Sequence, residues 1–129
     1  MATGFPAATG DVMTAAMFNG LVAFTLNAQT GTTYTSVIGD SYQTLVTMSN
    51  ASANAFKIPT NASVAHPIGT VITVMNIGAG TCTISAVTSG TTTVLSSGAT
   101  AAAPTLAQYK SAACIKTNTD VWYVVGAIG

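Results

Sequence analysis

Charged residues are the scarcest feature of this 129-residue chain, at 5% of its residues against about 25% in an average soluble domain. It has no arginine and no glutamate; its charged residues are Asp11, Asp40, Asp120, Lys57, Lys110 and Lys116. Three separated lysines form no basic patch, so the sequence predicts no nucleic-acid partner. The formal net charge is zero and 49% of the residues are hydrophobic. Neutrality gives little protection against self-association, so we expect other chains to cover much of the surface.

Long hydrophobic runs are also absent. A membrane-spanning helix needs about 20 mostly apolar residues, whereas the longest apolar run is the segment Val121–Gly129. The N-terminus has neither the positive region nor the apolar core of a secretory signal, and the first lysine is Lys57. We therefore expect no membrane partner, and synthesis in a cytoplasm without classical export.

Cysteine and histidine are too few for a zinc centre, which needs about four ligands. Cys82 and Cys114 lie in strand-like patterns that are typical of small buried hydrophobic residues; a disulfide between neighbouring strands is the alternative. His66, the only histidine, precedes Pro67. The sequence predicts no metal and no cofactor.

Catalytic signatures are missing as well. No G-x-S-x-G nucleophile motif occurs, and Gly78-Ala79-Gly80 lacks the lysine and the following helix of a phosphate-binding loop. Asp11 fits a helix cap, while Asp40 and Asp120 fit turns. An ordinary packed or turn histidine accounts for His66 better than a catalytic base. We expect a protein that is not an enzyme.

What the chain has in abundance is threonine, valine, isoleucine and alanine, punctuated by glycine, asparagine and serine. This spacing predicts an all-β fold, an antiparallel β-sandwich or barrel-like meander, rather than βαβ units. The expected strands are 21–26, 33–38, 44–49, 55–58, 70–77, 81–87, 92–95, 107–116 and 120–128. Hairpins are predicted at Gly78–Gly80, at Thr88–Gly90 and at Asn118–Thr119.

The N-terminal part differs in character. Residues 1–10 predict an extended arm, and Val12–Asn19 a short helix between Asp11 and Gly20. Thr25–Thr33 is expected to be a loop. We therefore divide the chain into residues 1–30, an arm and helix for docking or oligomerisation, and residues 31–129, the β-domain.

Two of the expected strands are apolar on both faces. In residues 70–77, Val71 and Met75 alternate with Ile72 and Val74; residues 120–128 behave similarly around Trp122. Such a strand is covered on both sides, either within a sandwich or by another subunit. We expect Trp122 to pack in a core or an interface.

The residues from about Tyr34 to Gly126 resemble a small β-module of tailed-bacteriophage virion structural proteins, found in capsid decoration (cement) proteins and tail-fibre segments. The matching residues are Tyr34, Asp40, Leu45–Met48, Asn50–Asn54, Ile58-Pro59, Asn61, Ser63–Pro67, Gly69-Thr70, Ile72, Gly78–Gly80, Thr83-Ile84, Ala107–Tyr109, Ile115-Lys116, Asp120, Trp122 and Val125-Gly126. The segment Gly10–Ala16 also resembles N-terminal segments of such proteins. His66 stands where an aromatic residue is common in this family.

The resemblance implies a virion location, a homotrimer and no catalysis. Only a short arm precedes the module, which favours a decoration protein that binds the major capsid protein on the outer surface of the capsid. The residues expected to dock on the capsid or a neighbouring protomer are Phe5, Pro6, Met13, Met17 and Phe18. The alternative is a tail-fibre or adhesin tip that binds a host surface receptor through loops Thr88–Gly90 and Ser96–Pro104, with His66 as a further candidate.

Overall fold

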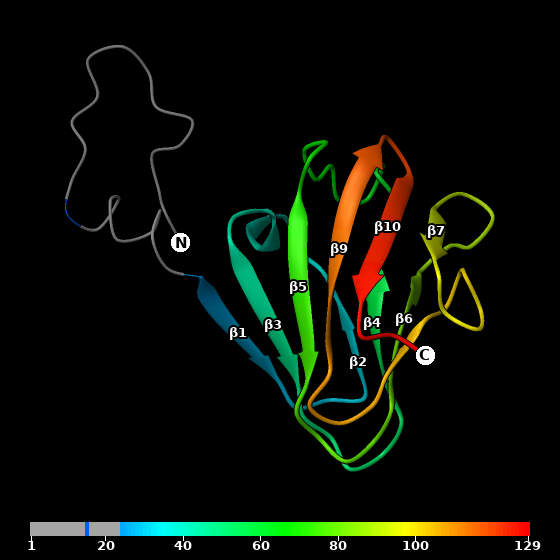
Figure 1. Cartoon of the computed structure of the whole chain (residues 1–129). Helices are drawn as coiled ribbons and strands as arrows, with labels where there is room; N and C mark the ends of the chain where they lie inside the picture. Colours follow the sequence, from blue (N-terminus) through cyan, green and yellow to red (C-terminus); the bar gives the residue numbers. More distant parts are fainter. Residues whose placement is uncertain (1–14, 16–23) are drawn as a thin grey trace.

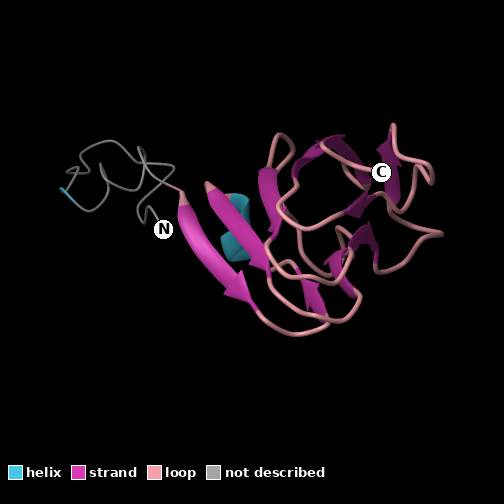
Figure 2. Cartoon of the chain, turned by 60° about the horizontal axis from the view of Figure 1, so that its bottom comes forward, coloured by secondary structure: helices cyan, strands magenta, loops and turns pink. Residues whose placement is uncertain are grey.

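The computed structural model describes Ala15 and residues 24–129. The expected arm, and the expected helix apart from Ala15, lie outside these residues. The described elements are β1 (Thr25–Gln29), β2 (Thr33–Thr35), the 3-10 turn η1 (Ile38–Ser41), β3 (Thr44–Met48), β4 (Asn54–Ile58), β5 (Val71–Asn76), β6 (Cys82–Ala86), β7 (Thr93–Ser96), β8 (Thr105–Leu106), β9 (Ser111–Asn118) and β10 (Val121–Gly126). Strands and turns therefore dominate residues 24–129 (Figure 2).

The strands form two sheets. Sheet A has six strands in the order β1-β3-β5-β9-β10-β7, and sheet B has four in the order β2-β4-β6-β8. Buried side chains from both sheets, including Val46 and Val74 of sheet A and Phe56 and Ile84 of sheet B, make one hydrophobic core. The all-β prediction is confirmed.

The strand directions differ from the prediction. The chain alternates between the sheets for its first six strands, and the neighbours β1, β3 and β5, like β2, β4 and β6, run parallel. These strands make three stacked coils (Figure 1). The first coil consists of β1 and β2, the second of β3 and β4, and the third of β5 and β6. Thr44 pairs with Ile72 and Asn54 with Cys82, so both strands of the third coil follow those of the second by the same 28 residues. The purely antiparallel meander was wrong, because apolar alternation specifies faces but not strand direction.

Two of the three predicted hairpins were also wrong. The Gly78–Gly80 turn carries the chain from β5 in sheet A to β6 in sheet B, and the segment with Thr88–Gly90 carries it back to β7 in sheet A. Only the turn at Asn118–Thr119 joins a true antiparallel pair, β9 and β10. β9 also pairs antiparallel with β5, while β7 pairs parallel with β10.

Gly78 and Gly80 allow their turn to pack closely against the turn at Asn50–Ser52. The amide of Gly80 donates to the carbonyl of Asn50 at 2.9 Å, and the amide of Gly78 donates to Met48 at 3.3 Å. A Cβ atom at either glycine would overlap backbone atoms of Asn50 or Ser52. The turn of the third coil therefore rests directly on the turn of the second.

The core follows from the period-2 alternation of the strands. Tyr34 pairs with Phe56, and Phe56 pairs with Ile84, so one inward-facing side chain per coil stacks in sheet B. Phe56 and Ile84 are fully buried, and each such side chain stabilises the fold by about 1.5–3 kcal/mol. Trp122 is 2% exposed, which confirms its predicted packing role.

The strand expected at 21–26 overlaps β1 only at Thr25 and Leu26, and β8 was missed. The segment expected to be a loop at Thr25–Thr33 contains β1, paired along its length with β3, so sheet A begins before residue 31, the expected start of the β-domain. Its inward residue Asn27 is polar, which obscured the alternation. β8 has two residues and no periodicity to detect.

Candidate functional site

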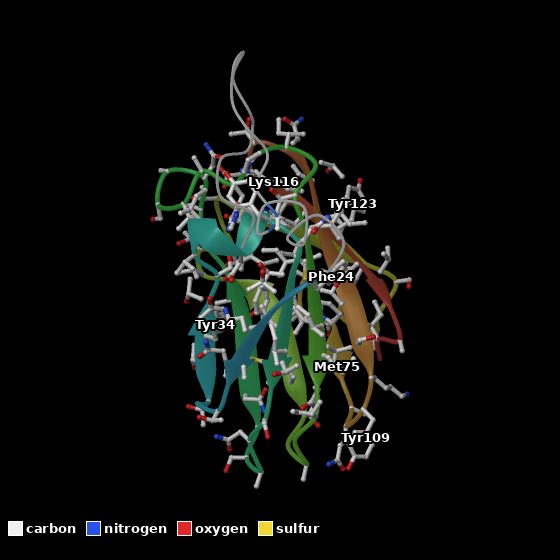
Figure 3. All side chains as sticks on the ribbon, turned by 90° about the vertical axis from the view of Figure 1, so that its left-hand side faces the viewer. Phe24, Tyr34, Met75, Tyr109, Lys116 and Tyr123 are labelled. Atoms are coloured by element: carbon white, nitrogen blue, oxygen red, sulfur yellow. The ribbon has the colours of Figure 1, made fainter. Side chains whose placement is uncertain are left out.

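The predicted docking residues Phe5, Pro6, Met13, Met17 and Phe18 all lie outside the described residues. Asp11 also lies outside them, whereas His66, Asp40 and Asp120 are described and take part in different hydrogen-bond clusters. Lys116 marks one end of the sandwich and Tyr109 the other (Figure 3).

His66 lies in a buried cluster at the Lys116 end. Its Nε2 is 3.0 Å from the hydroxyl of Ser36, and its Nδ1 is 2.5 Å from the hydroxyl of Ser41. Its ring meets Trp122 edge-on. Burial, and then the nearby ammonium of Lys116, lower the pKa of His66 below its ordinary value, although Asp40 opposes this shift. The imidazole is therefore neutral at pH 7, with both nitrogens engaged by hydroxyls.

Asp40 does not complete a catalytic triad with His66, because its carboxylate bonds to other partners. Its carboxylate accepts hydrogen bonds from the Tyr34 hydroxyl at 2.6 Å, the Val37 amide at 3.0 Å and the Asn27 side chain at 3.0 Å. Burial, and then Asp40, raise the pKa of Tyr34 to about 12. This cluster fills the interior of the first coil with hydrogen-bonded polar groups.

Lys116 is a buried lysine held by neutral oxygens. It is 2% exposed, and its Nζ donates to Asn61 Oδ1 at 2.6 Å and to the His66 carbonyl at 2.7 Å. Burial lowers the pKa of Lys116, while Asp120 opposes the shift. Asp120 in turn accepts from the Asn61 amide at 2.8 Å and from the Thr92 hydroxyl at 3.2 Å. These contacts tie the loop before β5 to the β9–β10 hairpin, which is a structural role.

Both cysteines are buried free thiols in the core, not a disulfide. Burial raises the pKa of Cys82 to about 11 and raises that of Cys114 further. A protonated buried thiol is a poor nucleophile and a poor metal ligand. Within residues 24–129, no group of three or more His, Cys, Asp or Glu side chains is placed to hold a metal ion.

The outer face of sheet A is the most distinctive surface of the described domain. One cross-strand row runs Leu26, Leu45, Thr73, Ala113 and Val125, and a second runs Val71, Ile115, Tyr123 and Leu95. We call these nine residues the sheet A face. Leu26 is 64% exposed, Val125 51%, Val71 44% and Tyr123 43%, so large apolar side chains are uncovered across the sheet.

No charged side chain of the described residues lies on the sheet A face. Lys57 is on sheet B, Lys110 precedes β9, Lys116 points inward, Asp40 is in η1, and Asp120 is in the β9–β10 turn. The outer face of sheet B is different in kind, because its aligned residues are mainly Thr33, Thr35, Lys57, Thr83, Ser85 and Thr105. The two layers thus present one apolar face and one hydroxyl-rich face. The sequence signal for this surface was the pair of strands that are apolar on both sides.

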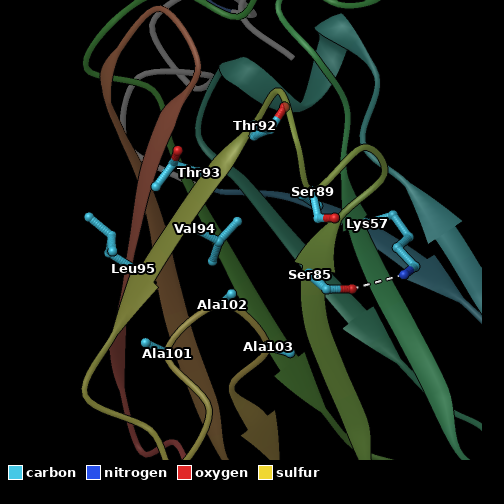
Figure 4. A pocket seen from close by; sticks show the side chains of 11 residues that line it. Lys57, Ser85, Ser89, Thr92, Thr93, Val94, Leu95, Ala101, Ala102 and Ala103 are labelled. Atoms are coloured by element: carbon cyan, nitrogen blue, oxygen red, sulfur yellow. Dashed lines mark hydrogen bonds between the residues drawn. The ribbon is translucent and has the colours of Figure 1, made fainter.

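A pocket lies at the edge of β6, beside β7 and the segment Ala101–Ala103 (Figure 4). Its volume is about 450 Å³, and Lys57 and Ser85 form its polar side, with a 2.9 Å hydrogen bond between them. It also borders Ser89 and Ala101–Ala103, which belong to the two loops considered for receptor binding. Ser36, Ser41 and His66 do not line it.

No family model matches this chain, no curated protein matches it, and no solved structure matches it. None of the helical residues between 24 and 129 belongs to a helix long and apolar enough to cross a membrane. Among residues 24–129, the candidate functional surfaces are the sheet A face and the β6-edge pocket.

Proposed function

We propose that this protein is a structural component of a bacteriophage virion, a decoration protein that binds the outer surface of the capsid as a homotrimer and stabilises the lattice. The observation that carries the proposal is the uncharged, apolar sheet A face. The residues with acid–base potential support it, because His66, Asp40 and Lys116 are buried in hydrogen bonds that hold the fold. The sequence resemblance to phage virion modules supplies the biological setting.

The sheet A face is the surface we assign to contacts between protomers. Contiguous exposed apolar residues mark protein interaction sites, and apolar area removed from water contributes about 25 cal/mol per Å². A stable interface buries about 800 Å² on each partner. A second copy of this chain suits the face, because an uncharged surface needs no opposite charge on its partner.

Docking on the major capsid protein is assigned to the N-terminal residues, with Phe5, Pro6, Met13, Met17 and Phe18 as the anchors. Aromatic and methionine side chains are enriched at interfaces. Many weak contacts repeated over a lattice add up through multivalency. Because so few charges are available, capsid binding should change little between low and high salt.

Deletion of residues 1–10, which removes Phe5 and Pro6, tests the part of this assignment that concerns the arm. The truncated protein and the full chain are mixed with undecorated capsids, and bound protein is measured after sedimentation. We expect the truncated protein to remain a trimer in light scattering but to lose capsid binding. Full binding by the truncated protein would show that the arm does not dock.

The second candidate function is a tail-fibre or adhesin tip that binds a host receptor. It is favoured by one observation: the β6-edge pocket lies between the loops that contain Ser89 and Ala101–Ala103. Such a protein would be present in a few copies per particle, whereas a decoration protein covers the lattice.

A further inference from the structure

The β6-edge pocket exists because sheet B is incomplete along one edge. β8 pairs with β6 only at Cys82 and Thr83, so the second half of β6, from Ser85 to Ala86, pairs with β4 on one side and has no strand on the other. β7, which follows, belongs to sheet A. The pocket of about 450 Å³ fills the space between them, within the range of about 300–1,000 Å³ that small-molecule sites occupy.

The polar side of the pocket is a donor pair. Lys57 Nζ donates to Ser85 Oγ at 2.9 Å (Figure 4). An ammonium has three donors, and a hydroxyl that accepts one hydrogen bond still has its own proton to donate. Lys57 and Ser85 can therefore present two adjacent donors, one of them charged, to the two oxygens of a carboxylate. No acidic side chain lines the pocket.

The rest of the lining combines hydroxyls with small apolar groups. Ser89 supplies a further hydroxyl, and Val94 with Ala101–Ala103 supplies methyl groups (Figure 4). A ring with hydroxyl groups on its edge and C–H groups on its face matches this mixture. A fatty acid would leave the hydroxyls without partners, and a bare inorganic anion would leave the apolar wall in contact with water.

We propose that the β6-edge pocket binds a carboxylated monosaccharide, with its carboxylate on Lys57 and Ser85 and its ring against Val94 and Ala101–Ala103. The site does not depend on the proposed capsid role, because it uses neither the N-terminal anchors nor the sheet A face. The ammonium of Lys57 binds the carboxylate, and this charged contact makes the pocket prefer acidic sugars over neutral ones.

The test is an amide chemical-shift titration of the full-length protein with D-glucuronate, and in parallel with D-glucose. We expect saturable shifts at Ser85, Ser89 and Thr93 with glucuronate, and affinity at least about tenfold weaker for glucose, which lacks the charged acceptor. Lys57→Met should weaken glucuronate binding by at least about tenfold. Lys110→Met makes the same change of charge outside the pocket, and it should bind like the wild type.

Three results would overturn the proposal: no saturable shifts at these residues at millimolar glucuronate, equal affinity for glucose and glucuronate, or wild-type affinity in Lys57→Met. Lys57 lies on the outer face of sheet B, so we expect Lys57→Met to fold like the wild type. The amide spectrum of the variant without ligand verifies this. If that variant misfolds, Ser85→Ala, which removes one of the two donors, provides the same comparison.

Discussion

The imidazole of His66 stands edge-on to the indole of Trp122, with the ring centroids 5.5 Å apart and the ring planes at 88°. The histidine is 3% exposed, and hydroxyls of Ser36 and Ser41 lie within hydrogen-bond distance of its two nitrogens. Its backbone carbonyl accepts a hydrogen bond from Lys116. His66 therefore joins the end of β2, η1 and β9 around Trp122, and its role is packing.

This arrangement predicts that acidification weakens the fold. The folded pKa of His66 lies below its ordinary value of 6.5, so the unfolded chain binds the proton first as the pH falls. The free energy of unfolding should be at its full value above about pH 6.5 and should decrease from there towards the folded pKa. Urea denaturation at several pH values between about 7.5 and 5.5 measures the change.

The matched control for the pH experiment is His66→Gln, which keeps a donor and an acceptor but does not titrate. His66 is the only histidine, so the variant lacks the one side chain type whose ordinary pKa falls in this range. The stability of the variant should therefore be nearly flat over this range. Wild-type stability that stays constant or rises on acidification would contradict the buried neutral state of His66.

Gly80→Ala should destabilise the protein by about 1–3 kcal/mol, a typical cost of overpacking. The added Cβ atom would overlap the Ser52 carbonyl in the turn beneath it. Gly90→Ala is the control, because nothing lies within 4 Å of a Cβ atom there, and its effect should stay within about 0.5 kcal/mol. Equal midpoints for the two variants in urea would mean that the turns of the second and third coils do not stack closely.

Val125→Lys should dissociate the proposed trimer. Val125 is 51% exposed on the sheet A face, and burying an unpaired ammonium in an apolar interface is unfavourable. Thr33→Lys adds the same side chain to the outer face of sheet B and should leave the trimer intact. Light scattering after size exclusion gives both masses. A trimeric Val125→Lys together with a dissociated Thr33→Lys would place the interface on sheet B instead.

The sequence revealed which residues face inward better than it revealed the topology. Trp122 was expected to pack in a core or an interface, and Ile72 and Val74 form one of the two apolar faces expected for their strand; all three are buried. The parallel winding of the first six strands could not be read from the same alternation. A glycine turn such as Gly78–Gly80 fits either a hairpin within one sheet or a crossing between two, and only the contact with Asn50 decides between them.

The candidate surfaces were predictable to different degrees. The sheet A face follows from two strands that are apolar on both sides, once their order in the sheet is known. The β6-edge pocket had no comparable signal, because it depends on β8 beginning only at Thr105, opposite Thr83. The hydrogen bond between Lys57 and Ser85 joins residues 28 positions apart. This contact forms because β4 and β6 run parallel with Lys57 opposite Ser85. That parallel pairing was not predicted from the sequence.

The most direct test of the proposed function is the number of copies of this chain in purified phage particles, relative to the major capsid protein. Quantitative mass spectrometry or gel densitometry of intact virions supplies this ratio. The account predicts a ratio near one or another simple fraction set by the capsid lattice. A handful of copies per particle would contradict the decoration role and favour the fibre tip, and absence from the particle would contradict both.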